Sequence, residues 1–390
     1  MKASFSSDDY WVVHWDGKLL PDLTDGGSGQ LVDRLPVIIS GKVTEQLLGA
    51  PKIETGTGAS QAEAVYKCLV DWGVQDNVVG MCFDTTSSNT GHKSGACTLV
   101  ERKLGRPLMN LACRHHVLEL VLKAAFEDQF GTSTSPQIPM FEKFRREWHA
   151  LDHSEHSSIE FSRNQAKLIS NRQETISFCK MQLKNFLPRD DYKELLELAL
   201  CFLGEAPISS FKKPGPVHRA RWMNKCIYAL KIYLFRKQLL LSVTEEKSLE
   251  KFCIFIVTTY IPSWYTAPLP LCAARWDTLL LKSLAKRKKD SMWKAAADKF
   301  KQHLWYLSPE LVGMAFFDDD LEVGIKKKMV NTLKRAPDHV GDALRIIVRW
   351  TFVMFCTSMP LICKSFGPTI NRDTIQRIVA QYGKKRTMLP

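Results

Sequence analysis

Two aspartates, each directly after a short apolar stretch, are the residues of this sequence that best fit a chemical role. Residues 78–83 are largely apolar, and Asp84 follows them, ahead of small polar residues and Gly91. Asp16 ends a similar stretch of alternating and β-branched residues that begins at Tyr10. If the two stretches are neighbouring parallel strands, the carboxylates meet at one sheet edge, where such a pair binds a divalent metal. For Asp84 alone, a turn or capping role is the alternative.

Cys113 and His116 form a Cys-x-x-His pair further along the chain. Structural zinc takes four ligands, and the sequence offers no second pair at zinc-finger spacing, so zinc is disfavoured. We expect the two side chains to pack beside the aspartates, with Cys113 structural and His116 orienting a carboxylate or contacting phosphate. The alternative for His116 is a histidine that is merely satisfied at a helix start. His115 is expected to face solvent.

A metal-dependent phosphodiester reaction that uses two cations usually needs a third acid. Glu310 is the candidate, and it lies after Ser308 and Pro309 at the start of the apolar segment 311–317. The same three residues fit a helix start, with serine as N-cap, proline in the first turn and a carboxylate that complements the macrodipole. Capping is therefore a complete alternative for Glu310.

The predicted elements would place the two aspartates together. Three strands come first, at residues 10–16, 34–41 and 46–54, followed by a helix at 60–72 that Ser60 caps. The strand before Asp84 spans 78–83. A helix at 91–104, a strand at 107–116 and a helix at 116–130 complete the order. This is the order of an RNase H-like domain, in which the first and fourth strands are parallel neighbours. We therefore expect the α/β class: an RNase H-like mixed sheet with a long all-α insertion and a helical C-terminal part.

Three domains are predicted from changes of pattern along the chain. A loop rich in Ser, Thr and Pro spans residues 131–139, and helical spacing dominates from there to residue 300. The predicted parts are an α/β core at 1–135, a helical insertion at 136–300 and a C-terminal helical part at 301–390 that completes the core. The Gly-rich stretch 23–30 reads as a hairpin loop. Because no Gly-rich loop joins a strand to a helix, a nucleotide-binding phosphotransferase is disfavoured.

Charge is distributed unevenly along the 390 residues. The chain has 54 Lys and Arg against 41 Asp and Glu, a formal net charge of +13. Residues 1–150 hold 15 basic and 18 acidic residues, which leaves 39 basic and 23 acidic residues for the remainder. A basic C-terminal part beside an acidic sheet favours DNA as partner, with a solvated surface as the alternative. The run Lys286, Arg287, Lys288 and Lys289 is read as a DNA-backbone contact or a nuclear-import signal, or alternatively as a solvated helix face.

Composition limits the class of protein further. Hydrophobic residues make up 45% and charged residues 24%, so the chain can bury a sizeable core. The 11 cysteines are scattered, which predicts reduced, buried thiols in an intracellular protein. The N-terminal residues contain no apolar signal segment, and no uncharged apolar run reaches about 18 residues, so no membrane span is expected.

Four motifs, taken in order, resemble those of a known family. They are CFDTTSSNTG, LACRHH followed by VLEL, RARWMN, and HLWYLSPELVGMAFFDD. Together they resemble the RNase H-like catalytic region of hAT-superfamily transposases, notably the transposase-derived sequences of animal genomes. The resemblance covers most of the chain, from Asp16 to the region around Asp318.

The resemblance implies roles for individual residues. In that family two strand-end aspartates and a later glutamate hold the divalent metals that cut DNA, which here implies Mg²⁺ or Mn²⁺ on Asp16, Asp84 and Glu310. A Cys-x-x-His lies near the acids, and an Arg-Trp pair in the helical insertion stabilises the DNA end. By position these residues are Cys113, His116, Arg221 and Trp222.

The sequence also departs from the family pattern. The N-terminal BED-type zinc finger has no counterpart, and the dimerisation segment is reduced to the apolar residues 345–367. We therefore expect a domesticated, nuclear DNA-binding derivative that does not transpose, with residual metal chemistry, homo-oligomerisation through that segment and no membrane partner. The alternative is a nuclear interaction module that has lost its chemistry.

Overall fold

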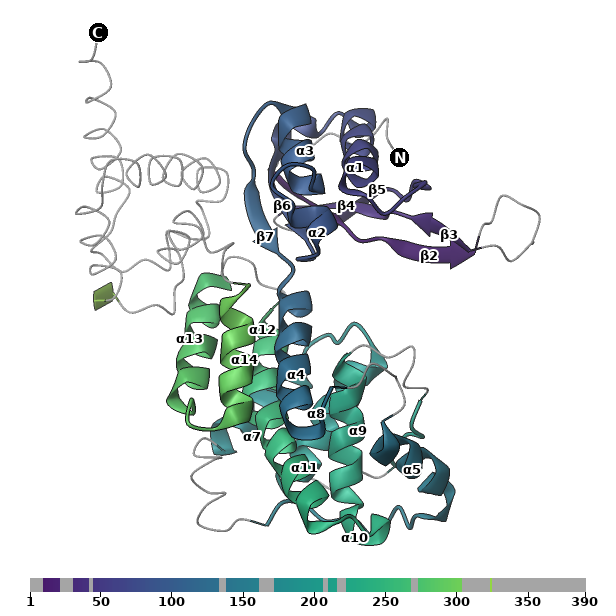
Figure 1. Ribbon diagram of the computed structural model, residues 1–390, viewed down its shortest axis with the longest axis vertical. Helices are drawn as coiled ribbons and strands as arrows, with labels where there is room; N and C mark the ends of the chain where they lie inside the picture. Colours follow the sequence, from purple (N-terminus) through teal and green to yellow (C-terminus); the bar gives the residue numbers. More distant parts are fainter. Residues whose placement is uncertain are drawn as a thin grey trace. The chain divides into compact units, whose positions relative to one another are not determined.

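The computed structural model describes residues 10–21, 31–41, 45–132, 138–160, 172–205, 210–215, 222–267, 273–303 and 323–324. Two compact units make up this part of the chain (Figure 1). The sheet unit contains the described residues up to Cys113, together with residues 273–275 and 323–324. The helical unit contains residues 114–267 and 276–303. The α/β class is confirmed, and nearly all of the predicted C-terminal part, 301–390, lies outside the described residues.

A five-stranded mixed sheet forms the centre of the sheet unit (Figure 1). Its order is β5-β4-β1-β6-β7, with β1 parallel to β6, β6 parallel to β7, and antiparallel pairing of β1 with β4 and of β4 with β5. The strands are β1 (Trp11–Trp15), β4 (Val37–Ser40), β5 (Glu45–Gly49), β6 (Val78–Phe83) and β7 (Met109–Ala112). The strands before Asp16 and Asp84 are therefore parallel neighbours, as predicted.

A two-stranded ribbon continues from β1 and β4. Its strands β2 (Lys18–Pro21) and β3 (Leu31–Arg34) pair antiparallel, with Pro21 opposite Leu31. The Gly-rich residues 23–30 thus join two antiparallel strands, in agreement with the predicted hairpin, although they lie outside the described residues. Asp16 and Gly17 form the short break between β1 and β2.

Helices α1 (Gly58–Trp72) and α3 (Ala96–Leu104) supply the apolar side chains that pack on the sheet. In β1 every second residue is buried, so Trp11, Val13 and Trp15 enter this core together with helix residues such as Val65 and Val100. Helix α1 begins earlier than predicted. Its N-cap is Thr57 and not Ser60, because the Thr57 backbone is extended and its hydroxyl accepts a hydrogen bond from the Ser60 amide at 3.4 Å.

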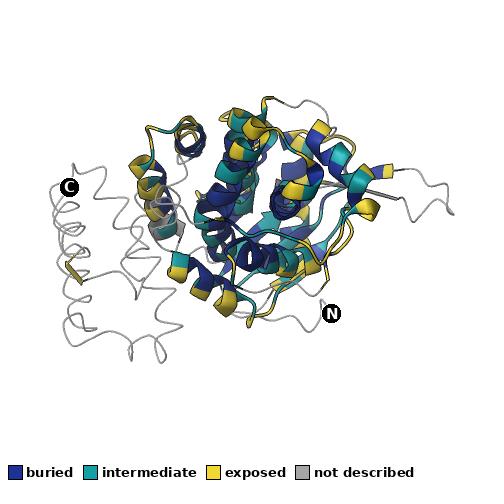
Figure 2. Ribbon diagram, turned by 90° about the horizontal axis from the view of Figure 1, so that it is seen from below, coloured by how far each residue is buried: buried dark blue, intermediate teal, exposed yellow. Residues whose placement is uncertain are grey.

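The helical unit confirms the predicted run of helices after the sheet. Its long helices are α4 (Arg114–Phe130), α5 (Pro139–Glu147), α7 (Arg172–Gln182), α8 (Asp190–Phe202), α9 (Trp222–Leu234), α11 (Val243–Phe255), α13 (Ala273–Lys286) and α14 (Ser291–Lys301). Most of them carry both buried and exposed residues, whereas residues 223–234 of α9 are buried or half-buried (Figure 2). Aromatic rings fill the interior: Phe126 lies edge-on to Phe252 at 5.4 Å, and Phe141 stacks on Tyr228 at 5.0 Å between centroids.

A π turn interrupts one helix of this unit. Residues 243–266 run as α11, the π turn Ile256–Tyr260 and α12 (Ile261–Thr266). Pro262 has no amide hydrogen and therefore cannot donate within the helix. A wider turn just before a proline accommodates the missing donor. The hydroxyl of Thr258 donates to the carbonyl of Ile254 at 2.7 Å inside this segment.

Candidate metal and nucleic-acid site

Asp84 lies directly after β6, and one of its carboxylate oxygens accepts three hydrogen bonds. The donors to Oδ1 are the Thr86 amide at 3.0 Å, the Thr86 hydroxyl at 2.5 Å and the Asn89 side-chain amide at 2.8 Å. The two bonds from Thr86 form the local turn that the capping alternative predicts. Asn89 is different, because it belongs to the short helix α2 (Ser87–Thr90) and is 4% exposed. The carboxylate is thus fixed in orientation as well as capped.

Asn89 connects Asp84 to the strand that precedes the other aspartate. The indole Nε1 of Trp15 donates to Asn89 Oδ1 at 2.9 Å, and this bond is buried. Trp15 is the last residue of β1, and its ring stacks on Phe83, the last residue of β6, at 5.9 Å between centroids. The ends of the two strands are therefore joined by a ring contact and by a buried polar chain.

Three glycines allow the loop after Asp84 to fold closely on itself. A Cβ on Gly58, at the start of α1, would lie 2.6 Å from the Ser88 carbonyl oxygen. A Cβ on Gly95 would lie 2.6 Å from the Asn89 carbonyl oxygen, and one on Gly91 would lie 3.0 Å from the Ser87 carbonyl oxygen. Because side chains do not fit there, the loop and the start of α1 form one packed structure beneath Asp84.

Asp16 is exposed and follows β1, the parallel neighbour of β6. Asp33 of β3 is a further acid near this edge that the sequence did not single out; a Cβ on Gly17 would lie 3.7 Å from its Oδ1. Carboxylate oxygens are the ligands that Mg²⁺ prefers, so Asp16 and Asp84 fit such an ion by type. The described residues contain no group of three ligands that could hold a metal. Glu310 lies outside the described residues.

Cys113 has a structural role in the sheet unit. Its amide donates to the Phe83 carbonyl at 2.7 Å, which extends the pairing of β7 with β6. Its thiol hydrogen-bonds with that of Cys82, and this bond and burial raise the pKa of Cys82 well above its usual value. The eight described cysteines are free thiols, as predicted.

The two residues after Cys113 anchor the start of α4 inside the helical unit. Arg114 donates to Asp277 Oδ1 at 2.7 and 3.0 Å and to the Thr266 carbonyl at 3.3 Å. The prediction that His115 faces solvent is wrong. Its Nε2 lies 3.1 Å from the Trp264 carbonyl, and its ring contacts the Trp264 ring at 4.2 Å, because α12 packs against this end of α4.

His116 is half-buried in the first turn of α4. Helix α14 runs antiparallel to α4: at one end Ser291 donates to Asp128 at 2.8 Å, and at the other His303 is close enough to His116 for their charges to interact. Burial lowers the pKa of His303 first, and Lys299 and His116 lower it further. His116 thus lies near a second histidine, and its contact with phosphate stays a prediction.

The basic run lies at the end of α13 and in the turn to α14. Lys286, Lys288 and Lys289 are exposed, whereas Arg287 is half-buried, with its guanidinium 4.9 Å from the centre of the Trp293 ring. Burial lowers the pKa of Arg287. Three of the four predicted DNA contacts are therefore accessible, and the fourth packs inward. Of the predicted Arg-Trp pair, Arg221 lies outside the described residues, and Trp222 begins α9.

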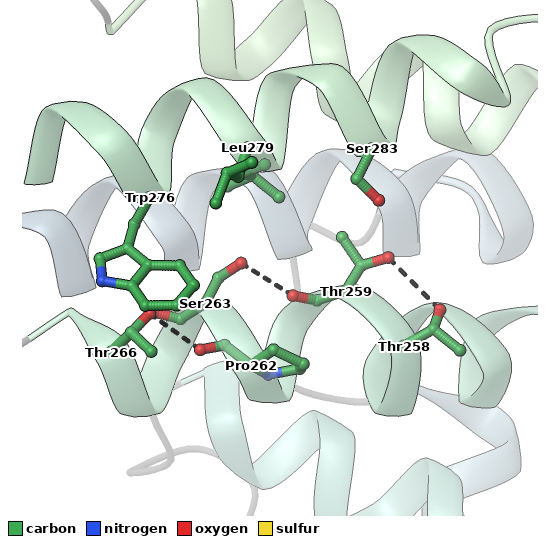
Figure 3. A pocket seen from close by; sticks show the side chains of 9 residues that line it. Thr258, Thr259, Pro262, Ser263, Thr266, Trp276, Leu279 and Ser283 are labelled. Atoms are coloured by element: carbon green, nitrogen blue, oxygen red, sulfur yellow. Dashed lines mark hydrogen bonds between the residues drawn. The ribbon is translucent and has the colours of Figure 1, made fainter. Parts of the chain in front are cut away.

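A pocket of about 140 Å³ lies between α13 and the π turn with α12 (Figure 3). Its wall combines apolar and hydroxyl side chains: Thr258, Thr259, Pro262, Ser263, Thr266, Trp276, Leu279, Leu280 and Ser283. Ser263 donates to the Thr259 carbonyl at 2.9 Å and Thr266 to the Pro262 carbonyl at 2.9 Å. These hydroxyl hydrogens are used within the helix, and the pocket holds no acid, base or thiol to act on a substrate.

Comparison with known proteins adds no relative. No model of a protein family matches the chain, and a search of curated proteins finds no significantly similar sequence. Among the described residues, no helix is both long and apolar enough to cross a membrane. The conclusions on function therefore depend on the residues and their geometry.

Proposed function

We propose that the protein is a transposase-derived DNA-binding protein with a residual Mg²⁺ site at Asp16 and Asp84. The observation that carries this proposal is the position of the two acids: each ends one of two parallel, adjacent strands, β1 and β6. Open α/β sheets place ligand-binding groups at such an edge. The orientation of Asp84 by three donors supports a site that is arranged in advance.

The strand order supports a finer assignment of the fold. With the ribbon strands left out, the five strands in chain order are arranged 3-2-1-4-5, with only the second antiparallel to the rest. An RNase H-like domain of a hAT-type transposase is expected to have this arrangement, with Glu310 as its third acid. In the active form one cation activates water or a 3′-hydroxyl and the other stabilises the leaving oxygen.

DNA is the proposed partner, and the nucleus the proposed location. The exposed lysines 286, 288 and 289 support contact with the phosphate backbone, and the excess of basic residues after residue 150 supports it further. Homo-oligomerisation through residues 345–367 is also proposed. That segment lies outside the described residues.

A second candidate function is DNA or protein interaction without catalysis. It is supported by the exposed lysines 286, 288 and 289, which could contact a partner without any third acid at the sheet edge. A single pair of carboxylates binds a cation weakly and does not hold two cations across a phosphate.

The deciding experiment compares wild type, Asp84→Asn and the control Asp71→Asn, whose carboxylate is exposed on α1. Cleavage of a labelled duplex would be measured with Mg²⁺, and binding by fluorescence anisotropy. The proposal expects Asp84→Asn to lose cleavage and keep DNA binding, while Asp71→Asn keeps both. Cleavage that survives Asp84→Asn refutes the site. Wild type that binds DNA without cleaving it supports the second candidate, and a wild type that does neither refutes the first proposal and leaves protein interaction as the second candidate's remaining form.

A further inference from the structure

Asn89 occupies an unusual place in the sheet unit, because its one amide group serves both strand ends. Its Nδ2 donates to Asp84 Oδ1 at 2.8 Å, while its Oδ1 accepts from Trp15 Nε1 at 2.9 Å. The Asn89 and Trp15 side chains are each 4% exposed, so water does not readily replace the bond between them, and the bond to Asp84 is partly buried. A buried amide that loses a partner retains the full cost of desolvation, and therefore both bonds constrain its orientation.

The Asn89 amide also connects the ends of the two strands, β1 and β6, by hydrogen bonds. Trp15 donates to Asn89, and Asp16 directly follows Trp15 in the chain. Asn89 in turn donates to Asp84, which lies five residues before it. Thr86 orients Asp84 only within its own turn. Asn89 thus ties the Asp84 carboxylate to Trp15, the residue directly before Asp16.

We propose that Asn89 is a positioning residue that sets the orientation of the Asp84 carboxylate relative to Asp16, and thereby the affinity of the pair for a divalent cation. This inference rests on the proposed metal site. Groups that hydrogen-bond to a metal ligand orient it, and their loss typically weakens metal binding by about 10- to 100-fold. Asn89 does not itself contact the cation.

The test uses Mn²⁺ as the probe, because free Mn²⁺ is quantified directly by electron paramagnetic resonance. Binding would be measured on the full chain for wild type, Asn89→Ala, Trp15→Phe and Asp84→Asn. Gln61→Ala is the matched control, since Gln61 is also a buried amide of the sheet unit, 9% exposed, but donates to the Gly56 carbonyl at 2.9 Å, away from Asp84. Urea unfolding of each variant separates lost stability from lost affinity.

The expected result is that Asn89→Ala weakens Mn²⁺ binding by roughly tenfold or more, and Trp15→Phe by several-fold, while Gln61→Ala loses stability and keeps its affinity. Trp15→Phe keeps an aromatic ring against Phe83 and decides the question if Asn89→Ala does not fold. Asn89 variants that bind Mn²⁺ as wild type does, while Asp84→Asn does not, overturn the inference and leave the metal site standing. Wild type that binds no Mn²⁺ overturns the metal site itself.

Discussion

One aspartate in each unit has a different kind of hydrogen-bond partner. In the helical unit Asp277 is 1% exposed and is neutralised by Arg114, which is 7% exposed. In the sheet unit Asp84 is half-buried and accepts hydrogen bonds from an amide, a hydroxyl and a backbone N–H. Hydrogen bonds from neutral donors orient a carboxylate without cancelling its charge. A buried carboxylate that is paired with a buried guanidinium, as Asp277 is with Arg114, is instead part of the core.

The largest expected effect is the loss of the buried charge pair. Asp277→Asn leaves the guanidinium of Arg114 buried and uncompensated, and should lower the free energy of unfolding of the helical unit by about 3–5 kcal/mol. Asp84→Asn should cost about 1 kcal/mol, because the amide oxygen still accepts hydrogen bonds. Urea unfolding followed by circular dichroism measures both.

A double variant supplies the control for this pair. Arg114→Met with Asp277→Leu removes both charges and should recover most of the loss, since paired buried charges are often replaceable by apolar residues. If Asp277→Asn and Asp84→Asn lowered the free energy of unfolding equally, the contrast between the two units would be contradicted.

The second effect tests the packed loop of the sheet unit. Gly58→Ala places a Cβ 2.6 Å from the Ser88 carbonyl oxygen and should destabilise this unit by about 1–3 kcal/mol. Gly49→Ala is the control, because its Cβ would make an ordinary contact of 3.5 Å with Cys68 Sγ. If both variants unfold alike, the loop is not the rigid support of Asp84 that its contacts indicate.

The third effect concerns DNA binding by the helical unit. Lys288→Gln and Lys289→Gln should each reduce the slope of log affinity against log salt by roughly 1, if each lysine neutralises one phosphate. Lys67→Gln, an exposed lysine of α1, is the control and should change the slope much less. Arg287→Gln should act mainly on stability, because its guanidinium packs on Trp293. An unchanged slope in the lysine variants would exclude this turn from the DNA contact.

The smallest effect is a dependence of stability on pH that both units share. Burial lowers the pKa of His14 in the sheet unit and of His303 in the helical unit. As pH falls through about 6.5, the unfolded histidines take up protons while the native ones resist, so the free energy of unfolding decreases. Urea unfolding at about pH 7.5 and about pH 5.5 measures this change. His14→Gln should reduce it in the sheet unit; an unchanged dependence would assign the effect to other groups.

The sequence predicted those features of the sheet unit that follow from local pattern. Alternation of apolar residues located β1, and the acid after each apolar stretch located Asp16 and Asp84 at strand ends. The predicted third strand, 46–54, is too long, because β5 ends at Gly49. Pro51 soon after it has no amide hydrogen to donate, and only an isolated bridge joins Lys52 to Arg34.

The polar contacts between distant residues were beyond such patterns. Trp15 and Asn89 are 74 positions apart, and a buried asparagine in a turn-forming stretch looks like any other turn residue. His115 was predicted to face solvent from its place beside His116, but its neighbour Trp264 is fixed by packing of α12 and α4. The spacing of residues in the sequence predicts which side of a helix a residue occupies. Which other residues cover that side depends on the tertiary fold.

The π turn at Ile256–Tyr260 makes the helical unit sensitive to residue number as well as residue type. A π turn holds one residue more than the regular helix, and each residue rotates a helix by about 100°. Deleting one residue within Ile256–Tyr260 would restore a regular turn and leave the residues after it on the same helix face, whereas inserting a further residue would rotate them by about 100°. Trp264 would then turn away from His115, and Thr266 would lose its place beside Arg114. This turn should therefore tolerate the deletion of one residue better than the insertion of one.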